Sequence, residues 1–183
     1  MATASAPNSV EMAILGGGCF WCLEAIFSGL RGVLSVTPGY CGGEVDQASY
    51  ELVCSGTTGH AEVVRVSFDP IQITFPELLE IFFASHDPTT RDRQGNDVGT
   101  QYRSVIFCLS DRQRQEALPA LEKARRDWGA PVVTSLEPAA PFYEAERYHH
   151  DYFARNGEQA YCQYVIAPKL AKVRYRFADM LVL

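Results

Sequence analysis

Three consecutive glycines, followed at once by a cysteine and two aromatic residues, constrain this chain more than any other feature of its sequence. The glycines, 16–18, come directly after a short apolar stretch, 12–15, that is typical of a strand. Glycine lets the backbone turn sharply and approach a ligand closely, so this pattern predicts a strand that passes through a tight turn into a helix. We expect that helix to begin at about Cys19 and to end near Leu30.

Cys19 is the candidate nucleophile because it would lie at the N-terminus of this helix. The free N–H groups and the positive dipole end there favour the thiolate, which is the reactive form of the side chain. Cys22 follows three residues later, on the same helix face, so a disulfide between the two is sterically feasible. Phe20 and Trp21 would supply an apolar wall to a site, or would belong to the core. Buried cysteines in a glycine turn are the alternative interpretation.

The composition indicates a soluble protein of one domain, since the chain has 183 residues with ordinary apolar and charged fractions. A net charge of −6 argues against nucleic acid as a partner, and no apolar run approaches the length that spans a membrane. The first residues lack the basic and apolar regions of a secretory signal, so we expect a reducing compartment, the cytoplasm. The cysteines and histidines do not have zinc-site spacing, and no metal is expected.

The order of the predicted elements favours a mixed α+β fold. Strands are expected at 12–15, 33–40, 61–68, 102–109 and 131–136. Helices are expected at 19–30, 74–84, 111–128, 144–155 and 168–181. Thr74 is a good N-cap, with Glu77 three residues later, and Asp111 is expected to cap the next helix. The order strand–helix–strand occurs twice, which predicts a ferredoxin-like split βαβ two-layer sandwich with long loops and a helical C-terminal extension.

Glu62 is the candidate acid, because the alternation of its strand places it on one face with Val64 and Val66. Burial of that face would raise the pKa of the carboxyl and keep it protonated, as a general acid requires. A solvent-facing glutamate at a strand start is the alternative. Tyr50 and Tyr102, expected at loop–strand edges, could donate hydrogen bonds to a developing oxyanion, or could only pack their rings.

The stretch 86–100 predicts a long polar loop, and loops of this length are often functional. Asp97 in this loop could bind a polar group of a ligand or could only form a turn. The remaining cysteines Cys41, Cys54 and Cys108 are expected to be buried or incidental. From the residues alone, thiol-dependent chemistry beside an apolar pocket is the functional prediction. A thioredoxin-like disulfide oxidoreductase and a non-enzymatic binding module are the alternatives.

Several strings extend this prediction because they closely resemble the peptide methionine sulfoxide reductase A family. They are GCFW at 18–21, GY at 39–40, YELVCSGTTGHAE at 50–62, HDP at 86–88, GNDVGTQYRS at 95–104 and FYEAE at 142–146. The similarity runs in order from Ala13 to Cys162. It implies reduction of the S epimer of methionine sulfoxide, free or in proteins, with no cofactor and with an external reductant such as thioredoxin. Residues 1–10 would then be a disordered N-terminal lead, and 11–183 a single catalytic domain, expected to be a monomer.

The resemblance also implies a role for each candidate residue. Cys19 matches the nucleophile that attacks the sulfoxide sulfur and becomes a sulfenic acid. Glu62 matches the acid that protonates the sulfoxide oxygen, and Tyr50 and Tyr102 match the phenols that hydrogen-bond it. The aromatic residues that match the wall around the methyl group are Phe20 and Trp21.

The resolving cysteine is open, because this sequence departs from a common family pattern in two places. Many members have glycine where this chain has Cys22, and many end in a glycine-rich tail with resolving cysteines. Cys162 matches the start of that tail, but the chain continues into a basic helix. Position in the family pattern therefore favours Cys162, local geometry favours Cys22, and a relay could use both; Cys41 and Cys54 are less favoured.

Overall fold

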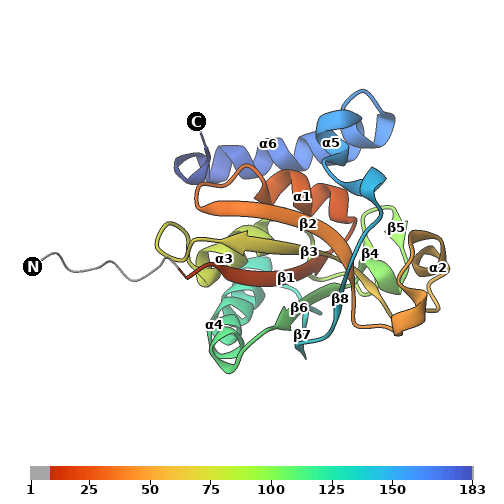
Figure 1. Cartoon of the computed structure of the whole chain (residues 1–183). Coiled ribbons are helices and arrows are strands. Elements are labelled where there is room, and N and C mark those ends of the chain that lie inside the picture. Colours follow the sequence, from red (N-terminus) through yellow and green to blue (C-terminus); the bar gives the residue numbers. More distant parts are fainter. Residues whose placement is uncertain (1–8, 183) are drawn as a thin grey trace, which may run out of the picture.

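The computed structural model describes residues 9–182 and has a curled six-stranded sheet covered by helices (Figure 1). The strand order is β7-β6-β1-β3-β2-β8. The strands of this sheet are β1 Glu11–Gly17, β2 Val33–Cys41, β3 Ala61–Phe68, β6 Ser104–Cys108, β7 Ser135–Pro138 and β8 Phe142–Glu144. Neighbouring strands are antiparallel except β6 and β7, which are parallel. A separate hairpin pairs β4, Arg93–Gln94, with β5, Asp97–Val98.

The helices lie mainly on one face of the sheet, where α1, α3 and α4 pack against its central strands. The α-helices are α1 Phe20–Phe27, α2 Tyr50–Cys54, α3 Phe75–Ser85, α4 Asp111–Trp128, α5 Tyr152–Arg155 and α6 Ala167–Arg176. Single turns of other helix types are 3₁₀ at Val45–Gln47, Thr100–Tyr102, Arg147–His149 and Ala178–Met180, and π at Cys162–Ile166. Helix α6 crosses above α1, so the C-terminal segment covers the start of the chain.

Alternation along the strands divides the buried residues between two clusters. Leu15 and Val64 belong to the large cluster shared with the helices, whereas Ile14 and Val63 belong to a small cluster on the other face. Because side chains alternate along a strand, Glu62 shares the helix-covered face with Val64. The pattern-based prediction for the face of Glu62 is therefore confirmed.

Local signals predicted several boundaries well. The predicted strand at 61–68 has the bounds of β3, and Thr74 caps α3 in a reciprocal capping box with Glu77. The predicted start of α4 at residue 111 is also confirmed, but its cap is Ser110 and not Asp111. The Ser110 hydroxyl accepts from the backbone N–H of Gln113, and Asp111 lies in the first turn.

The prediction of a helix over 144–155 is wrong. This segment starts in strand β8, continues through a 3₁₀ turn and ends in the four residues of α5. Asp151 has a left-handed backbone (φ 51°), which breaks a helix, and its N–H donates to the buried Glu24 carboxyl of α1. Distant packing partners, which a local pattern does not contain, determine this segment. The strand predicted at 131–136 begins only at Ser135.

The C-terminal helix predicted over 168–181 begins at Ala167 and ends at Arg176, before a 3₁₀ turn. The predicted loop 86–100 contains the short β4–β5 hairpin. Of the predicted N-terminal lead, residues 1–8 lie outside the described part of the chain. In residues 9–182, no helix is both long enough and apolar enough to span a membrane.

Candidate active site

The thiol of Cys19 lies where the end of β1 turns into α1. Gly18 makes this turn with a left-handed backbone (φ +94°), and a Cβ atom on it would lie 2.6 Å from Cγ of Gln94. A larger residue would therefore be strained and would also clash, which explains the glycine. Cys19 itself is the N-cap residue of α1 and only 8% exposed. The predicted strand–turn–helix placement of the candidate nucleophile is confirmed.

The protonation of Cys19 differs from the expectation that the helix terminus would favour a thiolate. Burial, a hydrogen bond with Cys22 and the Glu62 charge together raise the pKa of the Cys19 thiol well above its ordinary value. The Trp21 N–H at the start of α1 acts in the predicted direction but is outweighed. The expectation was wrong because it took into account the dipole of the helix but not the loss of solvation of the buried thiol. In the ligand-free protein Cys19 is a thiol.

Cys22 lies one turn along α1 and is buried beside Cys19. Its thiol is close enough to Cys19 and to the Tyr161 hydroxyl for both groups to lower its pKa. The hydrogen bond from Cys19 contributes most to lowering the pKa of Cys22, and the positive charge of Lys169 acts in the same direction. Tyr161 in turn donates to Asp97 Oδ2 at 2.6 Å.

Glu62 is the second residue of β3, where it opposes Tyr40 of β2, and it is 1% exposed. Its Oε2 accepts from the Phe20 N–H at 3.1 Å, which brings the carboxyl to the residue that follows Cys19. Burial raises the pKa of Glu62 to about 8, and the Asp97 charge adds to the effect. The carboxyl is therefore largely protonated at neutral pH and can give a proton to a bound group.

The two predicted tyrosines reach the same space from different elements. Tyr102 ends the 3₁₀ turn before β6, close to the predicted loop–strand edge. Tyr50 is instead the first residue of α2, because the side chain of Ser49 caps a helix there. Burial raises the pKa of both phenols, and the charges of Glu62 and Cys19 contribute to each increase. Both hydroxyls therefore remain protonated and can donate hydrogen bonds.

A set of aromatic residues that the sequence analysis missed encloses Trp21. The Tyr152 ring stacks on the indole at 3.6 Å between centroids, and the Tyr161 ring meets it edge-on at 5.7 Å. The indole N–H donates to Nδ1 of the buried His149 at 3.0 Å. All three covering residues come from 149–161, and the aromatic crowding of that stretch was the only local signal for their role.

Glu146 is a second residue that the sequence analysis did not single out. Its Oε1 accepts from the Tyr50 N–H and its Oε2 accepts from the Tyr40 hydroxyl, each at 2.7 Å. The carboxylate therefore joins β2 to the start of α2 and fixes the helix that carries Tyr50. Its place in the FYEAE string was the available signal.

All six cysteines are free thiols. Cys162 is fully buried, begins the π turn before α6, and lies close enough for the charge of Cys22 to act on it. Cys41 and Cys108 are buried in the sheet, as predicted, whereas Cys54 is exposed at the end of α2 within hydrogen-bonding reach of Tyr50. Cys22 is thus the thiol next to Cys19, and Cys162 is close enough to Cys22 for its charge to act.

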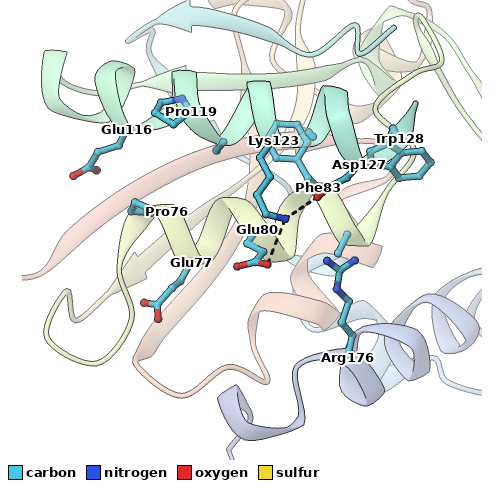
Figure 2. Close-up of a pocket in the computed structure, with 13 residues that line it drawn as sticks. Pro76, Glu77, Glu80, Phe83, Glu116, Pro119, Lys123, Asp127, Trp128 and Arg176 are labelled. Carbon is cyan, nitrogen blue, oxygen red and sulfur yellow. Dashed lines mark hydrogen bonds and ion pairs between the residues drawn. The ribbon is translucent and has the colours of Figure 1, made fainter. Parts of the chain in front are cut away.

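A groove of about 370 Å³ lies elsewhere, between α3, α4 and α6 (Figure 2). Apolar side chains, including Phe83 and Trp128, line it together with four carboxylates, and Lys123 bridges Glu80 and Asp127. None of the predicted site residues lines this groove. Nor do residues 9–182 contain three or more His, Cys, Asp or Glu side chains grouped to hold a metal ion.

A thiol adjacent to a protonated carboxyl, two phenol donors and a second thiol can reduce a substrate whose oxygen must be protonated before it leaves. The fold and the site thus define a thiol-dependent oxidoreductase. The family model for peptide methionine sulfoxide reductase matches residues 11–181. The chain belongs to the peptide methionine sulfoxide reductase family.

Individual relatives agree with this assignment. The peptide methionine sulfoxide reductase MsrA of Chromobacterium violaceum is 55% identical over 174 residues, which cover 94% of this chain and 99% of the relative. The reduced form of Mxr1 from Saccharomyces cerevisiae has a similar structure, with a TM-score of 0.78, 35% identity, and coverage of 87% of this chain and 92% of Mxr1. Mxr1 in complex with Trx2 is also similar, with a TM-score of 0.56, 29% identity, and coverage of 81% and 89%.

Proposed function

We propose that the protein reduces the S epimer of methionine sulfoxide, free or in oxidised proteins, to methionine, and so repairs oxidative damage. The position of Glu62 carries this proposal. A sulfoxide oxygen leaves only when it is protonated, and the buried Glu62 carboxyl, bonded to the Phe20 N–H, holds a proton beside Cys19.

In the first step, the Cys19 sulfur attacks the sulfoxide sulfur while Glu62 gives its proton to the oxygen. The proton that the Cys19 thiol loses passes to the Glu62 carboxylate, so that Glu62 is protonated again when the sulfenic acid has formed. Tyr50 and Tyr102 donate hydrogen bonds to that oxygen as charge develops on it. Phe20 and Trp21 form the wall that receives the methyl group, so that methyl and oxygen sites are fixed around a chiral sulfur. Methionine leaves, and Cys19 becomes a sulfenic acid. A polar contact from Asp97 to the substrate remains a prediction.

In the second step, another thiol condenses with the sulfenic acid to form a disulfide and water. Cys22 lies one helical turn from Cys19, whereas Cys162 is fully buried and is affected by the charge of Cys22, which supports Cys22 as the first resolving thiol and Cys162 as a relay. An external reductant then opens the disulfide. The similarity to Mxr1 in complex with Trx2 supports thioredoxin as this reductant.

We also propose the finer organisation of the protein. Its four central strands have the order β6-β1-β3-β2 with α1 and α3 as crossovers, which supports a ferredoxin-like split βαβ core. Residues 11–183 would form one catalytic domain, active as a monomer in the cytoplasm without a bound cofactor.

A single turnover tests the proposed function. The protein is mixed with one equivalent of S-epimer methionine sulfoxide and no reductant, and methionine and oxidised cysteines are then quantified. One equivalent of methionine is expected, whereas Cys19→Ser, which removes the nucleophile, is expected to form none. Cys108→Ser is the matched control, because that cysteine lies in β6 and should leave the yield unchanged. No methionine from the unmodified protein, or full yield from Cys19→Ser, would contradict the proposal.

A further inference from the structure

The helix that carries Tyr50 is weakly attached to the rest of the protein. Helix α2 has only five residues, lies at the edge of the molecule (Figure 1), and buries only Val53. Within residues 9–182, the bond from the Tyr50 N–H to Glu146 Oε1 is the only hydrogen bond that joins α2 to another element; its other bonds remain within residues 49–56. The position of Tyr50 therefore depends strongly on Glu146.

Glu146, in contrast, is held on a fixed backbone. The preceding strand β8 pairs with β2, and the Ala145 N–H donates to the Pro38 carbonyl at 2.9 Å. The second carboxylate oxygen of Glu146, Oε2, accepts from the hydroxyl of the fully buried Tyr40 at 2.7 Å. Because an unpaired buried hydroxyl is costly, this bond keeps the carboxylate from turning away from α2.

Tyr40 connects the same carboxylate to the candidate acid. Tyr40 and Glu62 are opposite each other in the β2–β3 ladder, so their side chains lie on the same face of the sheet. The Tyr40 ring also packs against Phe20 at 5.8 Å between centroids, and the Phe20 N–H donates to Glu62. The Tyr50 ring lies 4.4 Å from the His149 ring, which lies 5.0 Å from Phe20. One carboxylate thus ties the helix of Tyr50 to the strand pair that carries Glu62.

We propose that Glu146 is a positioning residue for the reduction, which holds α2 so that the Tyr50 hydroxyl can donate to the sulfoxide oxygen while Glu62 protonates it. This inference rests on the proposed function and on Tyr50 as a donor to that oxygen. In this role Glu146 contacts neither the substrate nor Cys19, and it exchanges no proton with them. Its effect on the rate should therefore not exceed the effect of the Tyr50 hydroxyl itself.

The test introduces Glu146→Ala into the unmodified protein, into Tyr50→Phe and into Tyr102→Phe. The rate of methionine formation is measured in a single turnover of the full chain with S-epimer methionine sulfoxide. In the unmodified protein the rate should fall about tenfold, as it should without the Tyr50 hydroxyl. In Tyr50→Phe no further loss is expected, because the hydroxyl that Glu146 positions is already absent. In Tyr102→Phe the loss should be at least as large as in the unmodified protein, because Tyr50 is then the only phenol donor.

A milder variant and a matched control accompany this test. Glu146→Gln has one acceptor oxygen, so it can accept from the Tyr50 N–H or from the Tyr40 hydroxyl, but not from both. Its loss of rate should be smaller and should also vanish in Tyr50→Phe, and it replaces Glu146→Ala in the comparison if that variant does not fold. Glu144→Ala is the control, because Glu144 belongs to the same segment but has a 58% exposed side chain that lies 3.5 Å from His150 Nε2. Its rate should be unchanged.

The two backgrounds distinguish positioning from a general structural role. An equal loss in Tyr50→Phe and in Tyr102→Phe would overturn the inference, because a general loosening of the site acts whichever phenol is present. A rate for Glu146→Ala as high as that of Glu144→Ala would overturn it as well. The proposed function would stand in both cases. Absence of methionine from the unmodified protein would overturn the proposed function and this inference with it.

Discussion

Two carboxyl groups flank the cysteine pair, and their surroundings differ. Glu62 is fully enclosed and accepts one hydrogen bond, from the Phe20 N–H. Asp97 is half-buried in a hairpin and accepts a hydrogen bond from the Tyr161 hydroxyl. Burial raises the pKa of Glu62 to about 8, so it holds a proton at neutral pH. Glu62 therefore suits the task of a proton donor, whereas Asp97 is placed to hold the Tyr161 hydroxyl.

The comparison indicates that burial, and not residue type, makes Glu62 a proton donor. The sulfoxide side of Cys19 has a carboxylic acid and two phenols that donate. Near Cys22 lie a phenol and a carboxylate, Tyr161 and Asp97, which are joined by a hydrogen bond of 2.6 Å.

The largest effect is expected for Glu62→Gln, which removes the proton but keeps the shape of the side chain. The methionine-forming rate should fall by on the order of 10²–10⁴-fold, the usual range for general acid catalysis. Rapid-quench measurement of methionine in a single turnover gives this rate. In the unmodified protein, the same rate should decrease as the pH rises through about 8, where Glu62 loses its proton.

Glu24→Gln provides the control for that comparison. Glu24 is also a buried glutamate, but it accepts from the N–H groups of Asp151 and Tyr152. Its substitution should leave the methionine-forming rate nearly unchanged. A rate for Glu62→Gln as high as that of Glu24→Gln would remove Glu62 from the mechanism.

A smaller effect is expected for the two phenols on the sulfoxide side. Tyr50→Phe and Tyr102→Phe should each reduce the methionine-forming rate by about tenfold, because one remaining donor still bonds the oxygen. The double variant should lose more than either single variant. Single-turnover rates of methionine formation by the three variants test this expectation. A single variant as slow as Glu62→Gln would show that the two phenols do not substitute for each other.

Sequence patterns predicted some residues of this site and missed others. Cys19, Glu62 and Tyr102 were placed correctly because a glycine turn, a strand alternation and a loop–strand edge are local signals. His149, Tyr152 and Tyr161 were missed because they meet Trp21 only through packing between segments more than a hundred residues apart.

Errors in local structure have the same physical origin. The segment 144–155 has helical composition, yet its pairing with β2 and the bond from the Asp151 N–H to Glu24 determine a different conformation. The thiolate expectation for Cys19 failed because a helix terminus is visible in a sequence and desolvation is not. For the same reason, the order of the strands in the sheet could be determined only from the structure, whereas α3 and its capping box were predicted from the sequence.

The smallest effects concern stability, where the two carboxyls are expected to differ in sign. The folded protein raises the pKa of Glu62 above its unfolded value, so Glu62 binds a proton on folding. Its contribution is fully present below the unfolded pKa and is lost as the pH rises through about 8. Glu62→Gln should therefore increase the free energy of unfolding relative to the unmodified protein. The difference should grow by about 1.4 kcal/mol for each pH unit between the two pKa values.

Asp97→Asn is expected to do the opposite, because it replaces the carboxyl that accepts the hydrogen bond from Tyr161 at 2.6 Å. A loss of about 1–2 kcal/mol is expected. Urea unfolding of both variants and the unmodified protein at several pH values gives the three free energies. If Glu62→Gln were destabilising at neutral pH, the buried carboxyl would be ionised in the folded protein and could not be the proton donor. If Asp97→Asn were stabilising, the Tyr161–Asp97 hydrogen bond would not hold the two groups together.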